Sequence, residues 1–230
     1  MPRLSDQAAE ILDTVDGEGR STALRPRRGQ VRLLHGNLGE AFWSSRPWLP
    51  YVWFGPVVSA CLEVAPPAAE VGTGVPILAV GGLWLCGGLA WMLLEYLMHR
   101  FFFHLPGKSR LAQEFRFVVH EHHHARPWDE RRIAATWWQM SLAMLLLFGI
   151  ERSLAPVVWP HVFLGTLIAY LLYEAVHYRI HHDQEGGRVL RAVRAHHLKH
   201  HHGPDGAARG FGISTPLFDW IFRTGTRATQ

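Results

Sequence analysis

Residues 75–104 read VPILAVGGLWLCGGLAWMLLEYLMHRFFFH, an apolar run over residues 75–98 that leads directly into two histidines. A transmembrane helix needs about 20 mostly apolar residues, and this run is long enough. Three further apolar runs cover residues 48–65, 133–150 and 157–176. One such run could be the buried core helix of a soluble protein, but in 230 residues too little amphipathic chain remains to cover four. The sequence therefore predicts an all-α integral membrane protein with four transmembrane helices.

The connections between the runs predict two helical hairpins. Pro66 and Pro67 interrupt the chain between the first two runs, and Ala155 and Pro156 interrupt it between the last two. The two hairpin tips contain only Arg152 of the 23 Lys and Arg residues. Because cytoplasmic loops of membrane proteins are enriched in basic residues, both termini and the central loop are predicted to be cytoplasmic.

The type and the position of the basic residues indicate which membrane contains the protein and which partners it contacts. Only two of them are Lys, a bias typical of GC-rich coding, so we expect an integral protein of a bacterial inner membrane. The net charge is +4, and the basic residues that cause it lie beside the apolar runs, where they can contact lipid headgroups. No nucleic-acid partner is therefore expected.

The reactive groups of the sequence are concentrated in four histidine clusters. All four fall on the predicted cytoplasmic side, and two of them stand at the inner ends of the second and fourth runs. An expression tag or a basic face for lipid headgroups are the alternative interpretations, but the clusters are internal and interleaved with other residues. The clusters are HRFFFH at 99–104, HEHHH at 120–124, HYRIHH at 177–182 and HHLKHHH at 196–202.

The spacing within the clusters predicts which imidazoles converge. Residues i, i+3 and i+4 share a face of an α-helix, which groups His120 with His123 and His124, His197 with His200 and His201, and His177 with His181. His99 and His104 are five residues apart and point about 140° away from each other on a regular helix. They either flank a site larger than one ion, or the helix ends near Pro106 and Gly107 and His104 turns inward.

Ten imidazoles exceed the four to six ligands of one ion, so the sequence predicts two metal ions. A hydrolytic zinc site needs only three protein ligands, so ten histidines at a membrane surface fit redox iron better. Carboxylates that fix the N–H groups of the ligands should offset the positive charge. Their candidates are Glu95, Glu174, Asp183 and Asp219.

These residues resemble the fatty acid hydroxylase and sterol desaturase superfamily of integral membrane di-metal enzymes, and within it the fatty acid 2-hydroxylases most. The resemblance covers residues 47–224, which we treat as the membrane-embedded hydroxylase domain between a cytoplasmic N-terminal segment, residues 1–46, and a short tail, residues 225–230. Its most specific stretches are EYLMHRFFFH at 95–104, YEAVHYRIH at 173–181, AHHLKHH at 195–201, GFGIST at 210–215 and FDW at 218–220.

The resemblance implies a ligand set, with no catalytic residue separate from it: His99, His104, His120, His123, His124, His177, His181, His197, His200 and His201. His122, His182, His196 and His202 are extra to the family pattern. Residues in a supporting role around the ligands are then Glu95, Glu174, His182, His196 and Asp219. The fold implied is two helix hairpins under a cytoplasmic, histidine-rich catalytic cap.

The resemblance also implies a dinuclear centre, with iron when active, that uses O₂ and two electrons to hydroxylate an acyl C–H bond. Because Zn²⁺ outcompetes Fe²⁺ at nitrogen sites, zinc is expected in overexpressed protein. Residues 1–46 are too short for the haem domain fused to eukaryotic relatives and lack its HPGG box, so a separate electron-donor protein is expected. Ala134–Trp138 replaces the proline-containing segment that usually follows the second cluster.

The sequence therefore predicts an O₂-dependent hydroxylase that acts on a fatty acyl chain of a membrane lipid, at the 2-position. The alternatives are a hydroxylase or desaturase of another lipid, such as a sterol, a carotenoid or an aminolipid, and a non-catalytic metal-binding membrane protein.

Overall fold

The structure is a computed structural model that describes residues 3–14, 30–65, 77–104, 107, 109–183, 185–203 and 205–226. Pro66, Pro67 and Pro106, which entered the predictions above, lie outside these residues. The regular structure that it describes is helical, apart from one isolated bridge between Leu4 and Leu34. The prediction of an all-α fold is confirmed for this part of the chain.

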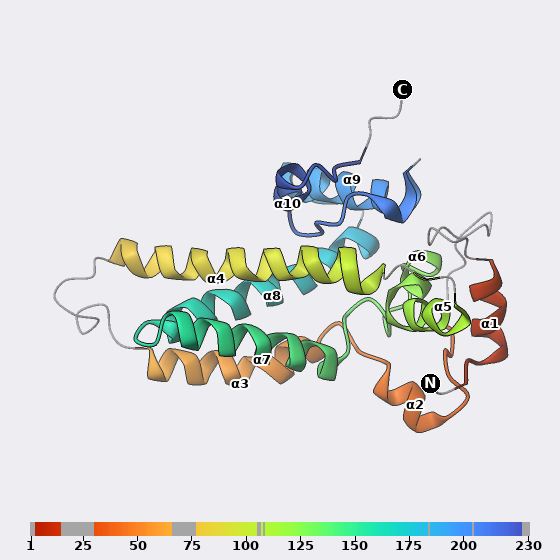
Figure 1. The fold of residues 1–230 in the computed structure, drawn as a ribbon, viewed down its shortest axis with the longest axis horizontal. Helices are drawn as coiled ribbons and strands as arrows, with labels where there is room; N and C mark the ends of the chain where they lie inside the picture. The colour runs from red at the N-terminus through yellow and green to blue at the C-terminus, as the bar shows by residue number, and fades with distance from the viewer. Residues whose placement is uncertain are drawn as a thin grey trace.

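Four long helices form an elongated bundle (Figure 1). They are α3 (Leu49–Val64), α4 (Ile77–Leu97), α7 (Trp137–Leu154) and α8 (Trp159–His182), one for each apolar run of the sequence. Two helical stretches are long and apolar enough to cross a membrane: α4 with its continuation, over Leu78–Phe103, and α8. The topology of four spans stays a prediction.

Two glycines allow α4 and α8 to pack closely. A Cβ atom on Gly87 would lie 1.8 Å from the carbonyl oxygen of Val162, and one on Gly165 would lie 2.1 Å from that of Trp84. Small residues at a helix interface let the backbones approach, as is common between membrane helices. The two helices therefore pack closely against each other, and at one end of the bundle α4 leads into the histidines that follow it and α8 ends in its own.

Short elements gather at that end of the bundle and form a cap (Figure 1). The chain continues from α4 into a π-helix, η1 (Met98–Phe103), and then into α5 (Arg110–Arg116). A second π-helix, η2 (Phe117–Glu121), leads into α6 (His122–Ala125). After α8 the chain forms α9 (Arg188–His202), the 3₁₀ turn η3 (Gly206–Ala208) and α10 (Leu217–Ile221).

The N-terminal segment is part of this cap rather than a separate tail. Its helices α1 (Asp6–Asp13) and α2 (Asn37–Phe42) flank a second hydrophobic core, distinct from that of the bundle. That core joins the N-terminal segment to η2, and its buried residues are Leu4, Ala8, Leu12, Leu33, Leu34, Phe117 and Val118.

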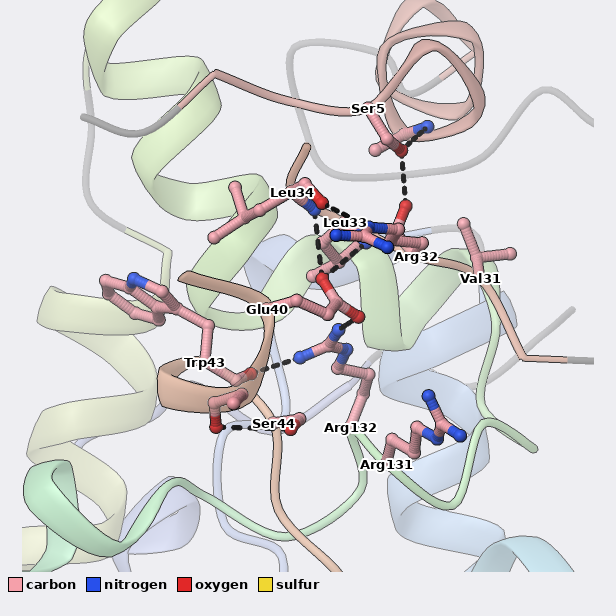
Figure 2. Close-up of polar contacts among 12 residues, drawn as sticks. Ser5, Val31, Arg32, Leu33, Leu34, Glu40, Trp43, Ser44, Arg131 and Arg132 are labelled. Carbon is pink, nitrogen blue, oxygen red and sulfur yellow. Dashed lines mark hydrogen bonds and ion pairs between the residues drawn. The ribbon is translucent and has the colours of Figure 1, made fainter. Parts of the chain in front are cut away.

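A partly buried carboxylate fastens the N-terminal segment to the loop before α7 (Figure 2). Glu40 accepts hydrogen bonds from the backbone N–H groups of Leu33 and Leu34, each at 3.0 Å, and pairs with the guanidinium of Arg132. Arg132 also donates to the carbonyl oxygen of Trp43. Because Arg132 precedes α7 and Phe117 belongs to η2, the N-terminal segment fixes two parts of the cap at once.

Candidate metal centre

The ten predicted ligands lie together where the bundle meets the cap. His99 lies in η1, directly after α4, His177 and His181 lie on the last turns of α8, and the others lie on or beside η1, η2, α6 and α9. His104 is partly buried, and the other nine are buried. Helices far apart in the sequence therefore bring all ten imidazoles to one place.

The imidazoles form two groups, each of which could hold a metal ion. The first contains His99, His104, His120, His124 and His200, and one nitrogen of each lies within 4.8 Å of one nitrogen of every other. The second contains His123, His181, His197 and His201 by the same measure. The tenth imidazole adjoins the second group, because Nε2 of His177 lies 3.1 Å from Nε2 of His123.

The π-helix explains how His99 and His104 meet despite their spacing of five. In η1 the backbone N–H of His104 donates to the carbonyl oxygen of His99 at 3.3 Å, the i to i+5 bond of a π-helix. The two rings are 5.0 Å apart. The divergence of about 140° expected from a regular helix is therefore wrong here, because the wider turn places both residues on one face.

The close nitrogen contacts fit metal ions better than hydrogen bonds. Nε2 of His120 lies 3.0 Å from Nε2 of both His99 and His124, and Nε2 of His197 lies 3.0 Å from that of His181 and 2.9 Å from that of His201. In each of these two sets of three, the central nitrogen has at most one hydrogen to donate. It can therefore form an ordinary hydrogen bond with only one of its two neighbours. Two nitrogens about 2.1 Å from one ion and about 90° apart are about 3 Å apart, as observed.

The protonation state of the imidazoles also suits metal binding. Burial lowers the pKa of His104, His120, His124 and His200 well below the ordinary value, and neighbouring imidazoles lower it further. The same holds for His123, His197 and His201. Neutral imidazole is the form that binds metals.

Backbone carbonyls orient two ligands of the first group. Nδ1 of His99 donates to the carbonyl oxygen of Phe211 at 2.6 Å, and Nδ1 of His200 donates to that of Arg209 at 2.8 Å. These bonds fix the Nε2 atoms as the ones with the free lone pair. The glycine-rich segment singled out in the sequence therefore acts as a support for the ligands.

Two buried carboxylates hold this segment in place. Asp219 accepts from the N–H groups of Phe211 and Gly212, at 2.9 and 2.7 Å, and from the Thr224 hydroxyl at 2.7 Å. His196 donates to Asp219 at 3.0 Å. Burial acts to raise the pKa of Asp219, but these hydrogen bonds outweigh it and the pKa is lowered.

Glu95 holds the same segment from the side of α4. Its carboxylate accepts from the N–H groups of Ile213 and Ser214, at 2.6 and 3.0 Å, and from the Ser214 hydroxyl at 2.7 Å. Glu95 and Asp219 therefore act on the ligands through Gly210–Ser214 rather than by direct contact.

The other proposed supporting residues have more varied surroundings. Asp183 pairs with Arg179 at 2.7 Å in a half-exposed position. His182 stacks on Tyr178, with ring centres 4.3 Å apart, and His202 is exposed. Glu174 is buried within α8, about one turn before His177 and two turns before His181.

His122 has a structural position that its place in the sequence did not reveal. It is buried, and its Nδ1 donates to the carbonyl oxygen of Phe117 at 2.8 Å, across η2. Burial and the nearby Arg132 lower the pKa of His122 to about 3. The i to i+5 relation of this bond again reflects the π-helix.

A small cavity of about 30 Å³ adjoins both groups of imidazoles. It is about the size of one water molecule. Histidines form one wall, including His120, His123 and His177, and Trp43 contributes to it from the N-terminal segment. Its other walls are mainly apolar, with Phe103, Val118, Ile133, Ala134 and Tyr173. Trp43 was not among the predicted site residues, whereas Ala134 belongs to the segment Ala134–Trp138 that the sequence had singled out after the second histidine cluster.

Comparison with known proteins agrees with this geometry. A family model described as fatty acid hydroxylase matches residues 84–224, which include all ten predicted ligands. The chain belongs to the fatty acid hydroxylase family. The solved structure of full-length scs7p, in which only the hydroxylase domain is visible, superimposes on this fatty acid hydroxylase family member with a TM-score of 0.74 and 26% identity, over 99% of this chain and 84% of that one.

Curated relatives of this fatty acid hydroxylase family member include 2-hydroxylases from animals and plants. Fatty acid 2-hydroxylase of Rattus norvegicus is 33% identical over 217 residues, which are 87% of this chain and 58% of the relative. Dihydroceramide fatty acyl 2-hydroxylase FAH2 of Arabidopsis thaliana is 30% identical over 177 residues, 76% of this chain and 71% of the relative. The chain thus spans somewhat over half the length of the animal relative.

Proposed function

We propose that this protein is an O₂-dependent membrane hydroxylase that acts at the 2-position of a fatty acyl chain of a lipid. The observation that supports this most is the pair of buried imidazole groups at the end of an apolar bundle, in a chain 33% identical to a fatty acid 2-hydroxylase. The ten histidines hold two metal ions, five ligands to each. The ions are iron in the active protein and zinc in overexpressed preparations.

When bound, the two ions supply the redox chemistry that uses O₂ and two electrons to place one oxygen atom in a C–H bond. The protein's own residues orient the imidazoles, keep them neutral and keep bulk water away from the reacting carbon. The carbonyl groups of Arg209 and Phe211 perform the first task for His200 and His99. The apolar walls of the cavity, among them Phe103 and Ile133, perform the last.

The position of the cavity supports attack near the carboxyl end of the chain. It lies where α4 and α8 end, so an acyl chain can reach it from the membrane leaflet at this end of the bundle while the polar headgroup stays at the interface. A carbon close to the headgroup then lies nearest to the imidazoles. Its volume of about 30 Å³ admits little more than the reacting methylene, so the rest of the substrate lies outside it.

The same features argue for an enzyme over a metal-binding protein, because the imidazoles are buried beside an apolar cavity rather than spread towards water. The proposal includes a separate protein as the electron donor. It also places the cap and both termini in the cytoplasm of a bacterium, with residues 47–224 as the membrane-embedded hydroxylase domain.

The test is a reaction of the purified, iron-loaded protein in lipid nanodiscs with ¹⁸O₂, a reducing system and an acyl lipid that is deuterated at one known carbon. We expect ¹⁸O at carbon 2 and loss of deuterium only from the substrate labelled there, as read by mass spectrometry. Oxygen found mainly at mid-chain or terminal carbons would contradict the 2-position. Absence of any oxygenated lipid from an iron-loaded, reduced sample would contradict the hydroxylase.

A further inference from the structure

The short helix α10 and the turn after it expose three large apolar side chains in a row. Trp220 is 79% exposed, Ile221 49% and Phe222 46%. Single exposed apolar residues are common on soluble proteins, but a contiguous group marks a surface that contacts a partner or a membrane. This group lies outside the candidate metal centre and has no part in the proposed reaction.

This apolar surface is fixed to the end of a candidate membrane span. The ring of Tyr96, on α4, stacks on Phe222 with centres 5.2 Å apart, and its hydroxyl lies 2.9 Å from that of Thr224. Figure 1 shows α10 beside the last turns of α4 rather than beyond them. α4 and η1 have exposed apolar side chains of their own there, at Leu97 and Phe101. The surface of α10 therefore continues the lipid-facing surface of the span.

Positive charge borders the apolar group. A hollow of about 740 Å³ beside α10 is lined by Arg209, Arg223 and Trp220. Among the described residues that line it, the one carboxylate is Asp219, which is 1% exposed and already accepts four hydrogen bonds. The accessible charge of the hollow is therefore positive.

This combination matches the border between lipid chains and headgroups. Trp is enriched at that depth because its ring is apolar and its N–H is polar. Arg near a membrane surface is attracted to anionic lipids. A protein partner would bury Trp220 as well, but the continuity with α4 favours the membrane.

We infer that α10 is an interfacial membrane anchor of the cap. Trp220, Ile221 and Phe222 enter the leaflet in which α4 ends, and Arg209 and Arg223 bind the phosphates of anionic phospholipids. The inference requires that α4 crosses the membrane, and it does not depend on the reaction that the metal centre performs. As a consequence, the cap lies against the bilayer on the side of α9 and α10. It is attached to the membrane by α10 as well as by the ends of the long helices.

Spin labels placed on the full chain in nanodiscs test the anchor. Cys61 and Cys86 are free and are first replaced by Ala. A nitroxide at Trp220→Cys is then compared with one at Leu85→Cys, which is 63% exposed on α4, and one at Gln7→Cys, exposed on α1. Collision with O₂ is high in lipid, whereas collision with a water-soluble nickel chelate is high in water. We expect the label at position 220 to collide more with O₂ and less with the chelate than the label at position 7, with values between those of positions 7 and 85 as befits an interfacial depth, and Ile221→Cys to agree.

Three different results of the spin-label experiment would overturn the inference. A label at position 220 that matches position 7 would place α10 in water, and one shielded from both reagents would indicate a protein contact, including a second copy of the chain. A water-like result at position 85 would remove the span on which the anchor depends. None of these readings uses hydroxylation, so a failure of the proposed function would not be confused with a failure of the anchor.

The role of Arg209 and Arg223 is tested by changing the lipid composition of the nanodiscs. With phosphatidylglycerol added to phosphatidylcholine, we expect the label at position 220 to become less accessible to the nickel chelate. Arg223→Gln, at an exposed residue, is expected to remove that dependence on phosphatidylglycerol while the label stays in lipid. An unchanged dependence in this variant, or none in the parent protein, would contradict phosphate binding by the hollow.

Discussion

Asp219→Asn tests whether a residue that touches no predicted ligand controls the metal centre. Oδ1 of Asp219 accepts from the Phe211 N–H and the Thr224 hydroxyl, and Oδ2 accepts from the Gly212 N–H and His196. An asparagine oxygen can replace only one of these two oxygen atoms. The amide NH₂ would then face the two donors on the other side, and their hydrogen bonds would be lost.

The size of the effect follows from those two bonds. Hydrogen bonds to charged groups contribute about 1.5–3 kcal/mol each, so the variant should lose about 3–6 kcal/mol of unfolding free energy if the loop cannot adjust. Movement of Gly210–Ser214 would displace the carbonyl of Phe211 and so the ring of His99. Loss of such indirect support typically lowers metal affinity about 10–100-fold.

The assay is metal retention during titration with a chelator, measured together with the melting temperature in detergent. Asp183→Asn is the matched control, because Asp183 is half-exposed and its carboxylate pairs with Arg179, which is also half-exposed. Such pairs contribute about 0–1 kcal/mol, so the control should resemble the parent protein. An Asp219→Asn variant that holds metal as tightly as the control would refute the role of the Gly210–Ser214 segment as a support.

Elemental analysis of folded protein should find two metal ions per chain, with zinc prevailing after overexpression; one ion or none would contradict the dinuclear centre. His201→Ala should abolish hydroxylation and lower the metal content, whereas the exposed neighbour variant His202→Ala should leave both unchanged; equal effects would refute the ligand assignment. Gly87→Ala should separate α4 from α8 and lower the melting temperature and metal content, whereas Gly81→Ala, where an added Cβ has no neighbour within 4 Å, should not; a stable Gly87→Ala protein would refute the close packing.

The apolar runs predicted the long helices closely in two cases and with an offset in the others. Residues 48–65 and 75–98 correspond to Leu49–Val64 and Ile77–Leu97. The third run begins at residue 133, but α7 begins at Trp137, because Thr136 and Gln139 form a capping box there. Hydropathy marks where a helix can lie in lipid, whereas hydrogen bonds at its ends decide where it starts.

The fourth run ends at residue 176, but α8 continues to His182. The extra turns contain His177 and His181, which are polar on a hydropathy scale and buried in the structure. The helix α8 extends beyond its apolar part because these histidines contact other imidazoles of the candidate metal centre. Tertiary contacts of this kind leave no trace in a local sequence window.

The packing of the N-terminal segment could not be predicted for a related reason. Its residues are polar and rich in Arg, and its few leucines lack a long periodic pattern. In the structure, Leu33, Leu34 and Phe117 meet in one core across more than 80 positions of sequence, and Glu40 finds Arg132 across 92. Only the fold brings such partners together.

The spacing rules predicted which histidines converge but not how they divide between the two groups. On a regular helix, a residue at i+4 lies about 40° from residue i, and one at i+3 lies about 60° to the other side. The clusters HEHHH at 120–124 and HHLKHH at 196–201 follow this geometry. His120 and His124 enter the first group and His123 the second, whereas His197 and His201 enter the second group and His200 the first.

The two groups are therefore built by the same rule. Each takes an i, i+4 pair from one of these two clusters, a single histidine from the other, and a pair from the end of a long helix. On α8 that last pair is His177 and His181, four residues apart in regular helix, with rings 5.2 Å apart. After α4 it is His99, in η1, and His104, which ends η1; they are five residues apart, with rings 5.0 Å apart. The π-helix η1 absorbs the extra residue, so a spacing that argued against convergence produces the same arrangement as its counterpart on α8.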